Sequence, residues 1–252
     1  MKKLVVSIFK AIGLYAFAIN MENKIITLFS KSERKKFYSQ FIQPGDLCFD
    51  VGANIGNRTV IFLELGAKVV AIEPQKECYE KLTKRFGDSI DLVKKGLGEK
   101  ESLEKLYVSE LSAISSFSKE HVDVMKEDRF KGTNWNHTVD IEMTTMDNLI
   151  DRFGTPVFCK IDVEGYEYDV LKGLSKPLKT LSLEYIVPEN LQVLIDCITH
   201  LKSLGDVECN YSYAEKMSMS LDAWLSGEEM IQYIQTKAFI DTSWGDIYVR
   251  FK

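Results

Sequence analysis

The sequence predicts an α/β fold, in which a mainly parallel sheet carries helices on both of its faces. Short apolar runs alternate with stretches of helical spacing along nearly the whole chain. The first run ends in a turn containing Gly52 and Gly56, and the second ends in Glu73, 21 residues after Gly52. Such alternation predicts parallel strands, because each helical crossover returns the chain to the same edge of the sheet.

The first half of the chain divides at its turn residues and apolar runs. Pro44-Gly45-Asp46 ends a first helix, and Gly66 closes a second one in the usual C-terminal position. The expected elements are helix 24–42, strand 47–51, helix 59–65, strand 68–72, helix 75–86, strand 90–95, a turn at 96–98 and strand 103–108.

The second half begins with the least regular stretch, residues 109–140, which is rich in serine and charge and which we expect to be an irregular insertion. Regular alternation then resumes, and a strand starting at Val157 runs into an acidic turn. The expected elements are strand 139–144, helix 146–153, strand 157–161, helix 168–174, strand 180–186, helix 189–204, strand 206–211, helix 227–237 and strand 246–251.

The chain of 252 residues divides into an N-terminal helical extension, 1–43, and one α/β domain, 44–252. Residues 4–19 are apolar, but Lys10 interrupts them and leaves a run too short to span a bilayer. We expect a helix here that packs on the domain or on a partner. Contact with a membrane interface and a signal peptide are the alternatives.

Composition excludes several classes of protein. Asp and Glu number 37 against 32 Lys and Arg, which disfavours a nucleic-acid partner. The five cysteines have no C-x-x-C spacing, which indicates a reducing compartment and no zinc site. We therefore expect a cytoplasmic protein, with membrane association through the N-terminal helix as the alternative. The basic run 31–36 is interpreted as a solvated helix face.

The glycine turn indicates which cofactor binds. A dinucleotide-binding turn needs G-x-G-x-x-G, whereas this chain has Asn54 at the middle position and its next glycine at Gly56. Asp50, just before the turn, would repel a diphosphate but suits a cationic group. S-adenosylmethionine carries an ammonium and a sulfonium, so it fits this charge pattern better than NAD does.

Three carboxylates stand at predicted strand ends, namely Asp50, Glu73 and Asp162. An acidic residue at the position of Glu73 is typical of one that hydrogen-bonds a ribose diol. In doubly wound sheets the carboxyl ends of the strands lie at one edge and form the ligand-binding crevice. We therefore expect the three side chains to converge on one cleft.

Three stretches carry a family resemblance. They are Phe49-Asp50-Val51-Gly52-Ala53-Asn54-Ile55-Gly56, Ala71-Ile72-Glu73-Pro74 and Lys160-Ile161-Asp162-Val163-Glu164-Gly165. On these motifs the chain resembles the FkbM family of S-adenosylmethionine-dependent methyltransferases, over about residues 40–250. The resemblance implies a Rossmann-like seven-strand methyltransferase fold. It also implies O-methylation of a hydroxyl on a sugar, a glycan or a natural product.

Carried over by position, the resemblance assigns contacts with S-adenosylmethionine to nine residues. They are Asp50, Gly52, Ala53, Asn54 and Gly56 in the loop, Glu73 and Pro74 beside the ribose, and Gly96 and Leu97 near the adenine. The acceptor-facing region of the family is variable, so its specificity does not transfer to this chain.

Transfer to an alcohol needs alignment and a base that accepts the proton. Asp162 is our first choice for that base or for orienting the acceptor, and Glu164 is the second. The alternatives are that both are structural, with Glu164 capping the next helix, or that the pair holds a divalent ion; we expect no metal. Ser115, Ser116 and His137 are candidates for contacting the substrate.

Two other functions compete with methyl transfer to a small-molecule or glycan acceptor. One is an NAD-type oxidoreductase, which Asn54 and the missing third glycine disfavour. The other is a non-catalytic protein that keeps the fold without turnover.

Overall fold

The computed structural model describes residues 31–110, 112–127, 133–214 and 216–252. The predicted helix at residues 4–19 therefore lies outside the described residues, as does the start of the predicted helix 24–42. Within the described part of the chain, no helix is both long and apolar enough to cross a membrane.

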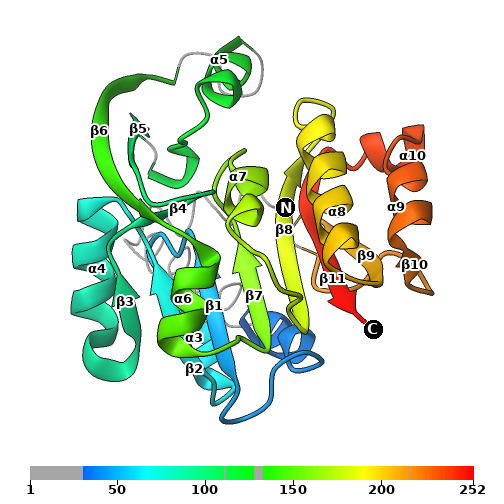
Figure 1. The fold of residues 1–252 in the computed structure, drawn as a ribbon, viewed down its shortest axis with the longest axis horizontal. Coiled ribbons are helices and arrows are strands. Elements are labelled where there is room, and N and C mark those ends of the chain that lie inside the picture. Colours follow the sequence, from blue (N-terminus) through cyan, green and yellow to red (C-terminus); the bar gives the residue numbers. More distant parts are fainter. Residues whose placement is uncertain (1–30, 111, 128–132, 215) are drawn as a thin grey trace, which may run out of the picture.

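A central sheet organises the molecule (Figure 1). Its strand order is β10-β9-β11-β8-β7-β1-β2-β3. Five strands are parallel: β3 (Asp91–Val93), β2 (Lys68–Ile72), β1 (Leu47–Val51), β7 (Phe158–Ile161) and β8 (Thr180–Ile186). The remaining three pair antiparallel: β11 (Trp244–Phe251), β9 (Val207–Tyr213) and β10 (Leu225–Ser226). The predicted α/β class with a mainly parallel, seven-strand sheet is confirmed, and the two-residue β10 is an unpredicted eighth strand.

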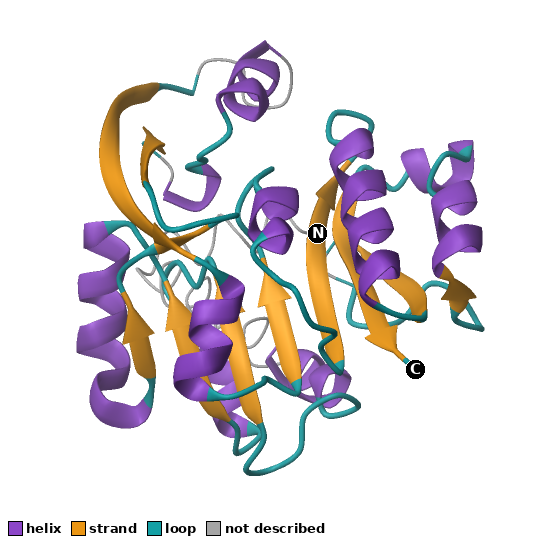
Figure 2. Ribbon diagram, in the orientation of Figure 1, coloured by secondary structure: helices purple, strands orange, loops and turns teal. Residues whose placement is uncertain are grey.

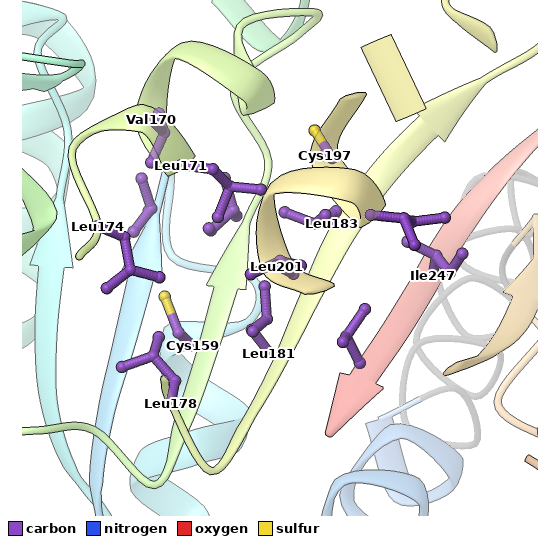
Figure 3. Packing of buried hydrophobic residues seen from close by; sticks show 14 of the residues in the cluster. Cys159, Val170, Leu171, Leu174, Leu178, Leu181, Leu183, Cys197, Leu201 and Ile247 are labelled. Atoms are coloured by element: carbon purple, nitrogen blue, oxygen red, sulfur yellow. The ribbon is translucent and has the colours of Figure 1, made fainter. Parts of the chain in front are cut away.

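Helices cover both faces of this sheet, and each face has its own apolar core. One face carries α6 (Met146–Phe153), α7 (Glu167–Lys172), α8 (Leu191–Leu204) and α9 (Gly227–Tyr233). Figure 3 shows Leu181 and Leu183 of β8 meeting Cys197 and Leu201 of α8 in that core. The other face carries helix 31–38, α3 (Thr59–Glu64) and α4 (Lys76–Phe86).

The described end of the N-terminal segment packs on the sheet through aromatic side chains. Tyr38 is fully buried, with its ring 5.6 Å from that of Phe158 on β7. Phe37 lies 5.2 Å from Tyr248 on β11. Such edge-to-face contacts stabilise packing beyond the area they bury. Helix 31–38 is therefore held at a defined place under the strands that carry the predicted site.

A smaller, three-stranded sheet, with strand order β4-β6-β5, is formed by β4 (Gly96–Leu97), β6 (Trp135–Thr144) and β5 (Leu103–Ser109). Together with the short helices η2 (Ser112–Ile114) and α5 (Lys119–Glu127), strands β5 and β6 form a unit that we call the cap. Figure 2 shows the cap beyond the carboxyl ends of the parallel strands. This edge of the sheet is where the sequence places the cleft.

Three sequence predictions are wrong in this region or near the C-terminus. The stretch 96–98, predicted as a turn, contains strand β4. Sequence reasoning missed this strand because its partners, Met143 and Thr144, are distant in the chain and leave no local pattern. The stretch 109–140, predicted to be irregular, contains α5 and the start of β6. The first part of β6 is largely exposed, so its sequence lacks the alternation of apolar and polar residues that predicts a strand. The helix at 227–237 ends at Tyr233, and Thr236 caps a separate helix α10 (Lys237–Ile240).

All five cysteines are buried and unpaired, and both Cys48 on β1 and Cys159 on β7 are fully buried. A free thiol in such a position packs as a small apolar side chain.

Gly52 sets how closely the ends of β1 and β7 approach. Its φ is +81°, and a Cβ built there would lie 1.8 Å from the backbone oxygen of Asp162. We expect Gly52→Ala to lower the free energy of unfolding by about 2–4 kcal/mol, from backbone strain plus displacement of β7. Urea denaturation measures this change.

Gly45→Ala is the matched control for Gly52→Ala. Gly45 has a φ of +90°, yet a Cβ at this position would meet nothing within 4 Å. It should therefore lose only the strain contribution, about 1–2 kcal/mol. Equal losses of unfolding free energy in the two variants would show that the close approach of β1 and β7 at Gly52 does not contribute to stability.

Candidate active site

A pocket opens at the carboxyl ends of β1, β2 and β7. Its lining includes nine of the predicted residues, namely Gly52, Asn54, Glu73, Pro74, Gly96, Leu97, Ser115, Asp162 and Glu164. We call it the nucleoside pocket, because its wall from the end of β2 to β4 is where the sequence predicts ribose and adenine.

Glu73 is held rigidly at the end of β2. It is 2% exposed, and its two carboxylate oxygens accept hydrogen bonds of 2.8 Å from the backbone N–H groups of Asn54 and Gln75. Each oxygen keeps a second lone pair for a further donor such as a ribose hydroxyl. Burial raises the pKa of Glu73 to about 7, although both backbone hydrogen bonds act against this shift.

In the glycine turn, Asn54 and Gly52 lie where the sequence predicts, beside the pocket, but Gly56 does not. Asn54 adopts the left-handed conformation, with φ 49°, and Gly52 lies beside the pocket. Gly56 does not line the nucleoside pocket; a Cβ there would lie 2.3 Å from the ring of Phe86 on α4. Gly56 therefore lets α4 pack closely against the turn.

The cap closes the nucleoside pocket from above. Ser112, Ser115 and Phe117 line the pocket, and the Gln75 side-chain amide donates to the backbone oxygen of Ser112 at 2.9 Å. Ser115 is 8% exposed and accepts a hydrogen bond from the backbone of Ser109. The hydrogen bond from Gln75 attaches the cap to the domain, and the bond between Ser109 and Ser115 lies within the cap.

A second, larger cavity of about 510 Å³ adjoins the first. Gly52, Asn54, Ser112, Asp162 and Glu164 line both, so the two are contiguous around the glycine turn. Asp50 and Ala53 line only the larger cavity. The three carboxylates predicted to converge on one cleft therefore line two contiguous cavities: Glu73 lines the nucleoside pocket, Asp50 lines the larger cavity, and Asp162 lines both.

Three carboxylates meet at the junction of the two cavities. One oxygen from each of Asp162, Glu164 and Glu184 lies within 4.8 Å of the other two, a spacing that could hold a metal ion. Lys160 already supplies a positive charge there: its ammonium is 3.0 Å from Asp162 and 2.9 Å from Asp246, and the side chain is 1% exposed. We call Lys160, Asp162 and Asp246 the ion triad.

The pKa values of Asp162, Glu164 and Glu184 shift in different directions. Burial alone would raise the pKa of Asp162, but the Lys160 charge and hydrogen bonds from Lys160 and Glu184 lower it. Burial raises the pKa of Glu164 well above its usual range, and the negative charges of Asp162 and Glu167 add to this. Burial raises the pKa of Glu184 in the same way, reinforced by Asp162 and Glu164. Asp162 stays ionised, and the two glutamates take up protons first.

Glu164 does not cap the helix that follows it. The backbone N–H groups of Val163 and Gly165 donate instead to Glu167, each at 3.2 Å. Glu164 has a φ of +56°, which is uncommon for a residue other than glycine, and the Ser116 hydroxyl donates to its backbone oxygen at 2.6 Å. Strain of this kind is often found at functional sites.

Some predicted residues lie away from the cavities, and some cavity residues escaped prediction. His137 is exposed on β6 opposite Val108 and lines neither cavity. Ser116 lines neither and holds the backbone of Glu164. Glu184 and Arg34 do line the larger cavity. The signal for Glu184 was one acidic residue in an apolar strand, whereas Arg34 was hidden in a basic run interpreted as solvated.

Removing the Glu73 carboxylate should weaken nucleoside binding. For Glu73→Ala we expect a loss of about 1–3 kcal/mol in affinity for S-adenosylhomocysteine, roughly 5- to 150-fold, measured by titration calorimetry. Glu77→Ala removes an exposed carboxylate on the neighbouring helix and should change nothing. Unchanged affinity in the Glu73 variant would show that the ribose is held elsewhere.

The raised pKa of Glu73 predicts a pH dependence of the same binding. Below pH 7 the carboxyl is largely protonated and is a poorer acceptor for hydroxyl donors. Affinity for S-adenosylhomocysteine should therefore rise about tenfold between pH 6 and pH 8. Calorimetry across this range tests it, and the dependence should disappear in Glu73→Ala. A flat profile in the wild type would refute the assignment.

Comparison with known proteins gives one family match and several solved structures of low sequence identity. Residues 50–217 match the family model described as "Methyltransferase FkbM domain". No curated protein matches the chain. A TehB-like S-adenosylmethionine-dependent methyltransferase from Corynebacterium glutamicum is 10% identical, with a TM-score of 0.45 over 94% of this chain and 98% of its own. Precorrin-6y C5,15-methyltransferase from Geobacter metallireducens is 11% identical, with a TM-score of 0.44 over 87% of each chain.

Proposed function

The chain belongs to the FkbM methyltransferase family, and from this premise we propose that it binds S-adenosylmethionine and methylates a hydroxyl on a sugar, a glycan or a natural product. The observation that carries the proposal is the pair of contiguous cavities. One is lined by the residues predicted to contact ribose and adenine, and the other, of about 510 Å³, has room for an acceptor. Carboxylates stand where the two meet.

The residues present suit this cofactor. Glu73 offers two buried carboxylate oxygens to ribose hydroxyls, and Gly52 leaves the end of β1 free of any side chain. Leu97 and Ile72 provide apolar walls for a flat ring. Asp50, 2% exposed, accepts a hydrogen bond of 2.5 Å from Thr59 and adds negative charge beside the turn, where a cationic tail is favoured.

When bound, the cofactor supplies a methyl group on a positively charged sulfur. The protein's own part is to align the acceptor and to take its proton. We assign the proton to Glu164, because it lines both cavities and its pKa is raised, which makes its carboxylate a stronger base than that of Asp162. Asp162, kept ionised by Lys160, would orient the acceptor hydroxyl by accepting a hydrogen bond.

Two measurements test the proposal. Calorimetry should show binding of S-adenosylhomocysteine and none of NAD; the reverse result would indicate an oxidoreductase and end the proposal. An assay of S-adenosylmethionine consumption against a panel of hydroxylated sugars, glycans and natural products then identifies the acceptor. Binding without turnover on any acceptor, including amine and thiol compounds, would favour the non-catalytic alternative.

A further inference from the structure

The larger cavity has walls of opposite charge. Asp162, Glu164 and Glu184 lie on the side of β7 and β8, and Asp50 lies at the end of β1. Arg34 from helix 31–38, Arg58 beside the glycine turn and Lys81 on α4 supply positive charge. A ligand group that enters between these walls therefore meets both signs of charge within one cavity.

The amino-acid tail of S-adenosylmethionine also carries both signs. Its ammonium and sulfonium suit the acidic wall, but its α-carboxylate needs a cation or N–H donors. Lys95 is the basic residue that lines the nucleoside pocket in the described part of the chain, and it stands beside Gly96, where the adenine is expected. The larger cavity, by contrast, is lined by Arg34, Arg58 and Lys81, so it offers the carboxylate more positive charge.

Arg58 is the best placed of the three basic residues in that cavity. It follows the turn residue Asn57 directly and stands at the N-cap of α3, half-buried. Its charge also reaches the carboxylates at the turn: burial raises the pKa of Asp50, and Arg58 is among the groups that oppose this rise. Lys81, by contrast, is exposed on α4.

Arg34 differs from its neighbours in the basic run. Lys35 and Lys36 are exposed, whereas Arg34 is half-buried and lines the cavity. The aromatic contacts of Phe37 and Tyr38 hold its helix under the sheet. An arginine presents a planar fork that matches the two oxygens of a carboxylate.

We infer that Arg58, assisted by Arg34 from helix 31–38, binds the α-carboxylate of the cofactor's amino-acid tail. This inference rests on the proposed function, because it assumes that the nucleoside pocket holds S-adenosylmethionine. It gives helix 31–38 a part in recognising the cofactor, in addition to covering the sheet.

The test compares two ligands that differ only in the carboxylate: S-adenosylhomocysteine and its decarboxylated analogue, which keeps the amine. In calorimetry, Arg58→Gln should weaken binding of S-adenosylhomocysteine about tenfold or more, while affinity for the analogue stays within about twofold. Arg58→Lys should restore part of the loss. Arg34→Gln should show the same ligand selectivity, and Lys84→Gln, which removes an exposed charge on α4, should alter neither affinity.

The outcomes separate this inference from the proposed function. Equal loss for both ligands in Arg58→Gln would mean that Arg58 only supports the turn, and no loss would mean that the carboxylate lies elsewhere; either overturns the inference alone. If the wild type binds neither ligand, the proposed function fails and the inference with it. Should Arg58→Gln fail to fold, Arg34→Gln decides by the same comparison.

Discussion

Replacing Glu164 by glutamine should lower the rate of methyl transfer about 10²- to 10⁴-fold, the usual contribution of a general base. The amide keeps the size of the side chain but cannot accept the proton. Affinity for S-adenosylhomocysteine should stay within about threefold, because the ribose and the tail are held by other residues. Turnover is measured on the acceptor that the consumption assay identifies, and affinity by calorimetry.

The wild-type rate should also depend on pH in a defined direction. Because the pKa of Glu164 is raised, the side chain is protonated at low pH and cannot act as a base, so the rate should rise as pH rises through that pKa. Glu164→Gln should lose this rise. Glu120→Gln, an exposed glutamate on the cap, is the matched control and should keep both rate and profile. A Glu164 variant with wild-type turnover would transfer the role of base to another residue.

Replacing Lys160 by methionine should lower the free energy of unfolding by about 3–5 kcal/mol. The ammonium is 1% exposed and contacts both Asp162 and Asp246, so its removal leaves two carboxylates close together without a counter-charge. Lys105→Met is the control, since its ion pair with Asp140 is largely exposed and should contribute less than about 1 kcal/mol. Chemical denaturation measures both. A loss in Lys160→Met no larger than in the control would show that the ion triad is not stabilising.

At acid pH, the difference in the free energy of unfolding between the wild type and Lys160→Met should become smaller. The pKa of Asp162 is lowered in the folded protein, so its contribution is present above the unfolded-state value, about 3.9, and is lost as pH falls through the folded-state value. The variant lacks this contribution at every pH. Denaturation curves at neutral pH and near pH 3 test the prediction, and a constant difference would refute it.

Regular elements with local signals were predictable from the sequence. Strands β2 (Lys68–Ile72) and β8 (Thr180–Ile186) and helix α6 (Met146–Phe153) have the bounds expected from their apolar runs and turn residues. Elements whose partners are distant in the chain were not. Strand β4 consists of two residues that pair with β6, and β10 of two that pair with β9. Such short segments carry no periodicity of their own, so only the pairing defines them.

Part of the site was also predictable, because its residues have local signals in the sequence. Asp50, Glu73 and Asp162 each end an apolar run, and parallel strands bring such ends to one edge of the sheet. Glu184 was missed because it lies inside a strand, where an alternating pattern does not say which face is solvated. Arg34 was missed because its neighbours in the basic run are solvated, and packing of the aromatic residues Phe37 and Tyr38 decides how its helix is turned.

The sequence by itself determined the strand–turn–helix plan, the glycine turn and the row of acidic strand ends, since each depends on residues close together in the chain. Only the tertiary structure decided which of these acids is ionised. Lys160 joins Asp162, at the end of β7, to Asp246 on β11, while Glu164 and Glu184 come from different segments and meet beside the negative charge of Asp162. A carboxyl group's charge depends on burial and on the charges within a few ångströms, and those neighbours come from segments far apart in sequence.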